Sequence, residues 1–390
     1  MIWPRNSGAT GKDMRWFWGA SVLVAAAVVA APVRAVEVPG LYEAEVPVGG
    51  QGALERVAAA QAGLEEVLVK VTGGGEVLDR PEIKTLVGQA EQWVQRYQYR
   101  AAPPAVPGSS VPAAGAEVTP LPMRILWLAF DRQFVNQQLA AAGVPIWGVN
   151  RPRTVVWLAE EKDGARFLVG GDNRPDLQQA LADQAARRGL PVTLPLLDLQ
   201  DQRSLNAADV WGDFADVITR ASERYQPEAL LVGRVYQVAP GQWQGHWTLY
   251  HRGAATSWDS APGQESDAVA AGIAGATDEF AKRYALSLTA EAANTMTVTV
   301  ENVASIKDYA RVLRYLKSLD PVAGVQVAEV QGDAVSFRLR VRSDPQAVVR
   351  SIGWGDTLVA AAGPQLSSAI NDGAGTAAAA DGEYRYRMAP

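Results

Sequence analysis

Four aspartates form the densest set of carboxylates in the sequence: Asp198, Asp201, Asp209 and Asp213. Asp198 follows a strand predicted over 192–197, and sites in α/β sheets commonly lie at the carboxyl ends of strands. Paired carboxylates serve as acid and base in hydrolases or hold a hard cation. However, no partner base singles them out, and Asp213 is placed to cap a helix. We favour a structural role for them and keep a carboxylate-dependent hydrolase at Asp198 and Asp201 as an alternative.

Other groups with catalytic chemistry are scarce. The 390 residues include no cysteine and two histidines, His246 and His251. No Ser-His-Asp set can be assembled with them, and no HExxH motif occurs. We therefore expect a protein that is not an enzyme, with no cofactor, no metal and no disulfide.

A loop that two prolines restrict carries Trp147, Asn150 and Arg151. Tryptophan and arginine are enriched in binding hot spots, so the loop is a candidate site for a small ligand or a glycan. The alternative buries Trp147 at the edge of the core and pairs Arg151 with a nearby acid. We favour that alternative because large aromatic residues are buried on average.

Trp243 and Trp247 are four residues apart and would suit sugar stacking if both were exposed. In a strand, however, they share one face with apolar neighbours, and that face is most simply core. His246 then points to solvent, and we place no site there.

Arginines alternate with apolar residues in two strands predicted near the carboxyl end. They share an outward face with threonines of a neighbouring strand: Arg338, Arg340, Arg342, Arg385, Arg387, Thr295, Thr297 and Thr299. Such a face would dock an anionic envelope component, such as lipid headgroups, lipopolysaccharide phosphates or an acidic protein. The alternative is an ordinary solvated sheet surface. The face has no aromatic residue, so nucleic acid is not an expected partner.

Residues 1–35 have the pattern of a secretory signal peptide. A basic stretch precedes an apolar run over 16–31, and Val33 and Ala35 suit the positions that signal peptidase recognises. We expect cleavage after Ala35, export to the periplasm and no transmembrane segment in the mature chain. An uncleaved signal anchor is the alternative, although the apolar run is short for a bilayer span. Without cysteine the mature chain has no site for a lipid anchor.

The composition is that of an acidic protein, and the chain is long enough for two or three domains. The chain has 36 Lys and Arg against 42 Asp and Glu, a formal net charge of −6 that becomes −9 without residues 1–35. Periodicity predicts an amino-terminal αβ region over 36–100, a Pro/Ala-rich linker or loop over 101–121, and a mixed-sheet α/β domain over 122–290.

The last domain is expected over 291–360 and 383–388, with the order β-α-β-β-α-β. This order is ferredoxin-like if the tail returns to the sheet, and we predict that Tyr384–Met388 forms an ordered edge strand. The Gly/Ala-rich stretch over 363–382 is expected to be disordered.

Four blocks of sequence carry a resemblance to a known family: 144–152, 195–199, 209–212 and 229–234. They resemble an exported proteobacterial family classed only as a domain of unknown function, numbered two thousand and sixty-six. The resemblance covers roughly residues 37–290 and implies an envelope location but no activity. More loosely, 229–234 with the hairpin and helix after it is similar to small domains of envelope assembly and activator lipoproteins, including the amino-terminal domain of TolB. The missing lipid-anchor cysteine departs from those lipoproteins.

These observations predict a non-catalytic periplasmic protein that binds another envelope component through α/β docking modules. The ligand-binding loop at Trp147 and the hydrolase at Asp198 remain the alternatives. A flat face of arginines favours the first interpretation, an aromatic-floored cleft the second, and an acid-lined pocket the third.

Overall fold

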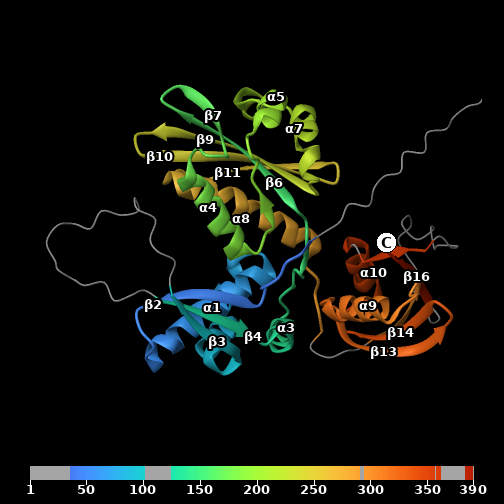
Figure 1. Ribbon diagram of the computed structural model, residues 1–390. Coiled ribbons are helices and arrows are strands. Elements are labelled where there is room, and N and C mark those ends of the chain that lie inside the picture. The colour runs from blue at the N-terminus through green and yellow to red at the C-terminus, as the bar shows by residue number, and fades with distance from the viewer. Residues whose placement is uncertain (1–35, 102–123, 290–293, 356, 362–382, 390) are drawn as a thin grey trace, which may run out of the picture. The chain divides into compact units, whose positions relative to one another are not determined.

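The computed structural model describes residues 36–101, 124–289, 294–355, 357–361 and 383–389 (Figure 1). The expected signal peptide, nearly all of the expected linker and the stretch expected to be disordered lie outside these residues. Within them, helices and mixed sheets occur together, so the α/β class predicted from the sequence is confirmed. No helix among the described residues combines the length and the apolar character that a bilayer span needs.

The first sheet has three antiparallel strands in the order β2-β4-β3: β2 (Glu43–Val48), β4 (Arg124–Phe130) and β3 (Val94–Ala101). Helix α1 (Ala53–Thr72) covers one face, because its Leu64 and Leu68 share a core cluster with Leu126 and Leu128 of β4. The remaining elements of this part are α2 (Pro81–Gly88), α3 (Arg132–Ala141), the 3-10 helices Gly75–Asp79 and Ala90–Trp93, and the antiparallel pair β1 (Val36–Glu37) and β5 (Asn150–Arg151).

The second sheet has the order β11-β10-β9-β6-β7, with β8 beside β6. Its strands are β6 (Thr154–Lys162), β7 (Ala165–Val169), β8 (Val192–Thr193), β9 (Ala229–Ala239), β10 (Gln242–His251) and β11 (Ala254–Asp259). Helices α4 (Pro175–Arg188) and α8 (Glu265–Tyr284) pack on one face; α5 (Leu199–Ser204), α6 (Ala207–Trp211), α7 (Ala215–Ser222) and the 3-10 helix Glu223–Tyr225 lie on the other (Figure 1). Strand β6 is parallel to β9 and buried on both faces, as its apolar run predicts.

The strand predicted over 192–197 is shorter in the structure, because only Val192 and Thr193 pair with β6. The backbone N–H groups of Leu196 and Leu197 donate instead to the side chains of Tyr225 and Asp201. The segment therefore leaves the sheet early.

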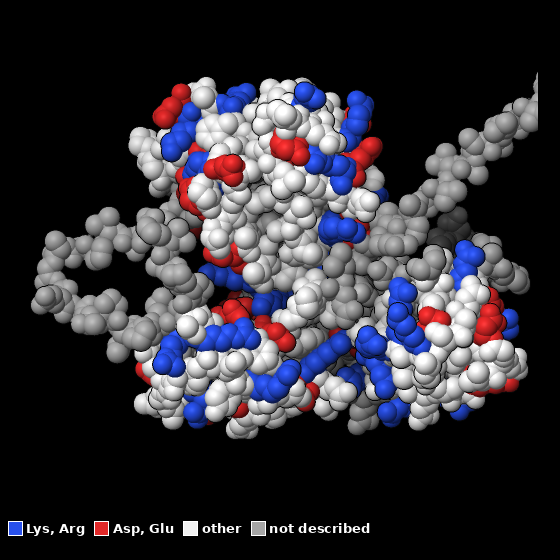
Figure 2. Space-filling view, viewed as in Figure 1, with Lys and Arg blue, Asp and Glu red and all other residues white. Residues whose placement is uncertain are grey.

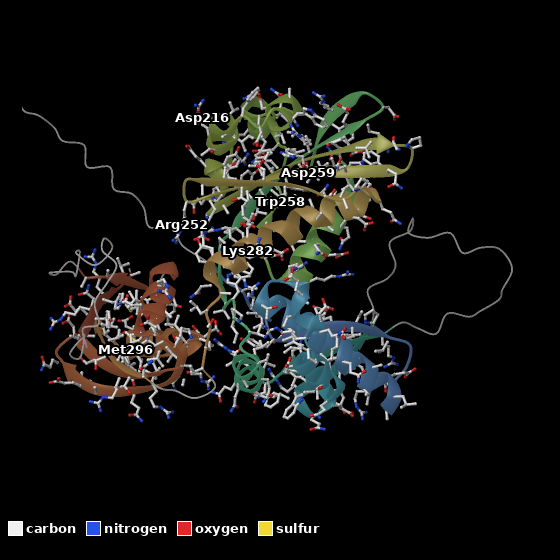
Figure 3. The ribbon with its side chains drawn as sticks, turned by 180° about the vertical axis from the view of Figure 1, so that it is seen from behind. Asp216, Arg252, Trp258, Asp259, Lys282 and Met296 are labelled. Carbon is white, nitrogen blue, oxygen red and sulfur yellow. The ribbon has the colours of Figure 1, made fainter. Side chains whose placement is uncertain are left out.

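Glycines on α8 make room for tryptophans of the second sheet. A Cβ atom on Gly272 would lie 2.4 Å from the ring of Trp247, and one on Gly275 would lie 2.3 Å from the ring of Trp258. Trp258, labelled in Figure 3, donates its indole N–H to the carbonyl of Ala271 on α8. The helix and the sheet are in close contact because these two positions carry no side chain.

The last sheet has the order β13-β14-β12-β16-β15. Its elements are β12 (Asn294–Glu301), α9 (Ile306–Ser318), β13 (Val322–Gln331), β14 (Ala334–Val341), α10 (Pro345–Trp354), β15 (Leu358–Ala360) and β16 (Glu383–Met388). The tail strand β16 pairs in parallel with β12, so the predicted strand is present. It is not an edge strand, because the short β15 pairs outside it, with Leu358 opposite Met388.

Both helices of this part pack on the same face of the sheet. Val312 and Leu316 of α9 and Ile352 of α10 share a core cluster with Phe337 and Leu339 of β14. The opposite face of the sheet, called here the open face, consists of the alternate residues of its strands.

Candidate functional site

The open face brings together four of the five arginines that the sequence predicted there. In the β12–β14 pair, Arg338 lies opposite Thr297 and Arg340 opposite Thr295. In the β12–β16 pair, Arg385 lies beside Thr299. The four open-face arginines, which are exposed, are Arg338, Arg340, Arg385 and Arg387. Four guanidinium groups from two strands thus flank one row of threonines.

Two contacts lie among the arginines of this face: a hydrogen bond between hydroxyl groups and the close approach of one arginine side chain to the backbone of β13. The hydroxyls of Thr299 and Ser336 lie 2.8 Å apart and form a hydrogen bond. The side chain of Arg340 extends over Gly324 of β13, where a Cβ atom would lie 2.9 Å from its Nη2. Among the described residues, no ion pair involves Arg338, Arg340 or Arg387. Arginine donors that are exposed in this way can bind carboxylates or phosphates bidentately.

Arg342 differs from the other four. It lies just beyond the end of β14 and is half-buried. Its backbone carbonyl accepts a hydrogen bond from the N–H of Thr289, and the chain bends at residues 342 and 343. We therefore leave Arg342 outside the open face.

The Trp147 loop is packed inside the protein. Trp147 is 1% exposed and Arg151 is fully buried. The guanidinium of Arg151 lies 3.9 Å from the centre of the Trp147 ring. It donates hydrogen bonds to five backbone carbonyls, those of Lys70, Trp147, Gly148, Arg188 and Gly189. Burial lowers the pKa of Arg151 to about 9.

Burial of this loop favours its packing role over a ligand site. The carbonyls that Arg151 binds belong to the end of α1, the end of α4 and the loop itself, so the arginine joins three segments. The acid that we expected as its partner is replaced by these carbonyls. Asn150 is half-buried and lies opposite Glu37 in the β1–β5 pair.

Asp198 and Asp201 are brought together, but by a shared arginine. Asp198 is the N-cap of α5 rather than the end of a strand, and it accepts from the backbone N–H groups of Gln200 and Asp201. The guanidinium of Arg224 lies 2.7 Å from Asp198 and 2.9 Å from Asp201. Hydrogen bonding to Arg224 holds the pKa of Asp198 well below its usual range. Asp201 is buried and also accepts from the hydroxyl of Tyr225.

The other two aspartates also have structural partners. Asp209 forms a capping box with Asn206 at the start of α6. Asp213 does not cap α7, whose N-cap is Phe214 without a side-chain hydrogen bond. Its backbone is left-handed, with φ of 53°, and its carboxylate accepts from the hydroxyls of Thr248 and Tyr250. All four carboxylates thus already bind donors within the protein.

The tryptophans of β10 are part of the core side of the sheet. Trp247 is fully buried and Trp243 is half-buried, as the alternation predicted. His246 lies on the other face, and its Nδ1 is 2.7 Å from a carboxylate oxygen of Asp259, a partner that the sequence did not suggest.

One charged cluster was missed by the sequence reasoning. Glu160 of β6 is fully buried, and the guanidinium of Arg174, immediately before α4, binds it together with Glu265 and Asp176. One oxygen of Glu160, Oε1, has no hydrogen-bond partner. Burial raises the pKa of Glu160 to about 7, and the carboxylate of Glu265 adds to the rise while Arg174 opposes it.

The signal for this cluster was present in the sequence. Glu160 directly follows the apolar run over 155–159, in a strand that is buried on both faces. A carboxylate there needs a cation, but the sequence does not say which one. Within the described part of the chain, no group of three or more His, Asp or Glu residues is arranged to hold a metal ion.

Comparisons with known proteins add a family match for one segment. Residues 35–148 match a family described as Domain of unknown function (DUF8605). This match supports an uncharacterised domain, although its number differs from that of the family that the sequence blocks resemble. No curated protein matches the chain.

Two solved structures give weak matches. They are the competence or damage-inducible protein from Enterobacter asburiae and a competence-damaged protein (CinA) superfamily protein from Enterobacter cloacae. Each is 13% identical with a TM-score of 0.20 and covers 39% of this chain, and the matches cover 94% and 88% of those chains. Similarity at this level carries no argument about function.

Proposed function

We propose that this is a non-catalytic periplasmic protein that binds another, anionic component of the cell envelope through the open face of its last sheet. The observation that carries the proposal is the set of four exposed open-face arginines, which two strands hold on one surface. A single exposed ion pair contributes little, about 0–1 kcal/mol. Four arginines on a rigid sheet can act together, since the sheet fixes their spacing before the partner arrives.

Two features of the sequence support the location. Residues 1–35 have the pattern of a signal peptide, and residues 37–290 resemble an exported family. Mass spectrometry of the protein recovered from the envelope fraction tests this part. An amino terminus at Val36 is expected, whereas one upstream of Trp16 would favour the uncleaved anchor.

The two alternative functions have less support from the geometry. The loop lines a small cavity, but Trp147 is only 1% exposed, so its ring offers a glycan little surface to stack on. The aspartates around Asp198 bind donors within the protein. The docking interpretation is therefore the one that the described residues favour.

Crosslinking in intact envelopes tests the docking surface. A photo-reactive residue at Gln326, which is exposed and lies beside Arg338, should capture the partner. A photo-reactive residue at Gln200, exposed on α5, is the positional control. Changing Arg338, Arg340, Arg385 and Arg387 together to Gln should abolish capture at Gln326 without lowering the melting temperature. If this variant gives the same captured species with the same salt dependence, the proposed docking face is wrong.

A further inference from the structure

Helix α9 carries a second basic surface, on the side of the domain opposite to the open face. Its 13 residues include four basic residues and one acidic residue. The four exposed side chains that form the α9 stripe are Lys307, Arg311, Arg314 and Lys317. Their spacing of three or four residues places them on one face of the helix, along roughly 15 Å of its axis. Figure 2 shows Lys and Arg side chains gathered over α9.

The charges of the α9 stripe are not neutralised within the described residues. No ion pair among those residues involves any of the four side chains. The single acid, Asp308, binds the hydroxyl of Ser305 at the start of the helix. On the buried side, Val312 and Leu316 anchor α9 to the sheet, so the stripe is held on a rigid element.

Exposed apolar side chains lie beside the stripe. Ile306, the first residue of α9, is 82% exposed, and Val330 of β13 is 62% exposed. Helix α9 packs against β13. Tyr315 points to α10, because its hydroxyl donates to the carbonyl of Ile352. Ile306 is half a turn around the helix from Tyr315, so it faces away from α10. Ile306 and Val330 therefore lie on the same flank of the domain. Isolated exposed apolar residues are common, but here they border a row of cations.

From this combination we propose that the α9 stripe docks the protein on the surface of a bilayer that contains acidic phospholipids. The four cations bind the lipid phosphates, and Ile306 and Val330 enter the boundary between headgroups and acyl chains. A helix with a basic face and apolar neighbours suits this environment, since both kinds of side chain gain from it. The phosphate backbone of a nucleic acid would use the cations but leave the two apolar side chains in water.

This inference assigns acidic lipid to the helical side of the domain, and it therefore leaves an anionic component other than lipid, such as an acidic protein, to the open face. The lipid-bound domain would leave its open face available to another component. Two binding surfaces on opposite sides of one domain would let the protein hold that component close to a membrane.

Co-sedimentation with lipid vesicles tests the inference. The full chain is mixed with vesicles of phosphatidylcholine alone or with phosphatidylglycerol added, and the readout is the extra binding that phosphatidylglycerol causes. Residues 1–35 carry a net charge of +3 and are identical in every variant, so their contribution to binding cancels when variants are compared. Changing Lys307, Arg311, Arg314 and Lys317 together to Gln should lower the affinity for acidic vesicles by two to three orders of magnitude, since each cation near an acidic membrane contributes about 1 kcal/mol.

The open-face variant, with Arg338, Arg340, Arg385 and Arg387 changed to Gln, is the matched control. It removes the same number of charges from the same part of the chain and should keep nearly all of the extra binding. Ile306→Ser should weaken binding to acidic vesicles severalfold without affecting binding to inorganic polyphosphate. If both fourfold variants lose binding equally, the effect is one of net charge and the inference is overturned.

Two further outcomes would also overturn it. In the first, the open-face variant alone loses vesicle binding, which would assign the lipid to the open face. In the second, the protein binds duplex DNA or polyphosphate through the α9 stripe but does not bind acidic vesicles. Crosslinking from Gln326 is scored separately, so the proposed function and the lipid contact can fail independently.

Discussion

Arg151 and the open-face arginines carry the same guanidinium group into opposite environments. Arg151 is fully buried and its donors bind five backbone carbonyls, whereas Arg338 and Arg340 are exposed and have no ion-pair partner among the described residues. The guanidinium of Arg151 forms all of its hydrogen bonds within the protein and is unavailable to a binding partner. The guanidinium groups of Arg338 and Arg340 remain accessible to a binding partner. Residue type alone thus says little about function until burial and hydrogen bonding are known.

The largest effect is expected at the buried member of this comparison. Arg151→Ala should lower the free energy of unfolding by more than ~3 kcal/mol, because it leaves several buried carbonyls without donors and opens a cavity beside Trp147. Arg151→Lys keeps the charge but has fewer donors, so an intermediate loss is expected. Urea denaturation followed by tryptophan fluorescence measures both. An Arg151→Ala variant within ~0.5 kcal/mol of the parent would contradict the role that we assign to its hydrogen bonds.

Two helical glycines allow a buried and an exposed position to be compared without any change of charge. Gly272→Ala should destabilise the protein by ~1–3 kcal/mol, since its Cβ atom would overlap the ring of Trp247. The matched control is Gly353→Ala in α10, where no atom beyond the adjoining residues and the backbone of the helix itself lies within 4 Å of the new Cβ atom. There alanine should be neutral or stabilising by up to ~1 kcal/mol, because it favours the helix. If both substitutions shift the thermal midpoint equally, close packing at Trp247 is not the reason for glycine at residue 272.

Glu160 and Glu161, which are adjacent on β6, allow a buried and a less buried acid to be compared through the pH dependence of stability. The pKa of Glu160 is raised to about 7 from an ordinary value of 4.5, so the folded protein holds this proton more tightly than the unfolded chain. Its stabilising contribution is complete below about pH 4.5 and is lost as the pH rises through about 7. The contribution of Glu160 to the free energy of unfolding should therefore fall by ~3 kcal/mol across this window, and Glu160→Gln should remove that fall. Glu161→Gln, at the next residue, is the control, because Glu161 is less buried and pairs with Arg166.

Denaturation of the three proteins at several pH values decides this point. A parent whose stability rises between pH 4.5 and 7 by an amount that Glu160→Gln abolishes would reverse the expected sign. A pH dependence shared equally by Glu160→Gln and the parent would assign the effect to other groups.

Local patterns in the sequence were sufficient for most elements and for the open face. Alternation over residues 335–341 placed apolar side chains inward and arginines outward, because a strand that packs on one side has only two faces. The same rule placed Trp247 in the core and His246 on the other face. Strand β15 was missed, because it has three residues and owes its pairing to Met388, which is remote in sequence.

Partners of buried charges could not be predicted, since they depend on contacts between distant segments. Arg151 binds carbonyls of α1 and α4, and no sequence pattern marks a carbonyl as an acceptor. Glu160 is 105 residues from Glu265 and meets it through Arg174. Asp213 looked like a helix cap by its spacing, yet it binds hydroxyls of the neighbouring strand β10. Tertiary contacts thus overrode local capping preference at this residue.

The smallest effect is expected at the exposed member of the comparison. Arg338→Ala should change the free energy of unfolding by less than ~0.5 kcal/mol, because its guanidinium has no ion-pair partner among the described residues and stays in water. Salt provides a finer test, since the open-face arginines repel one another and added salt screens that repulsion. Raising the salt concentration should therefore stabilise the parent slightly more than the variant with all four open-face arginines changed to Gln. If Arg338→Ala instead destabilises the protein as much as Arg151→Ala, the arginine is part of the packing, and its availability to an anionic partner must be given up.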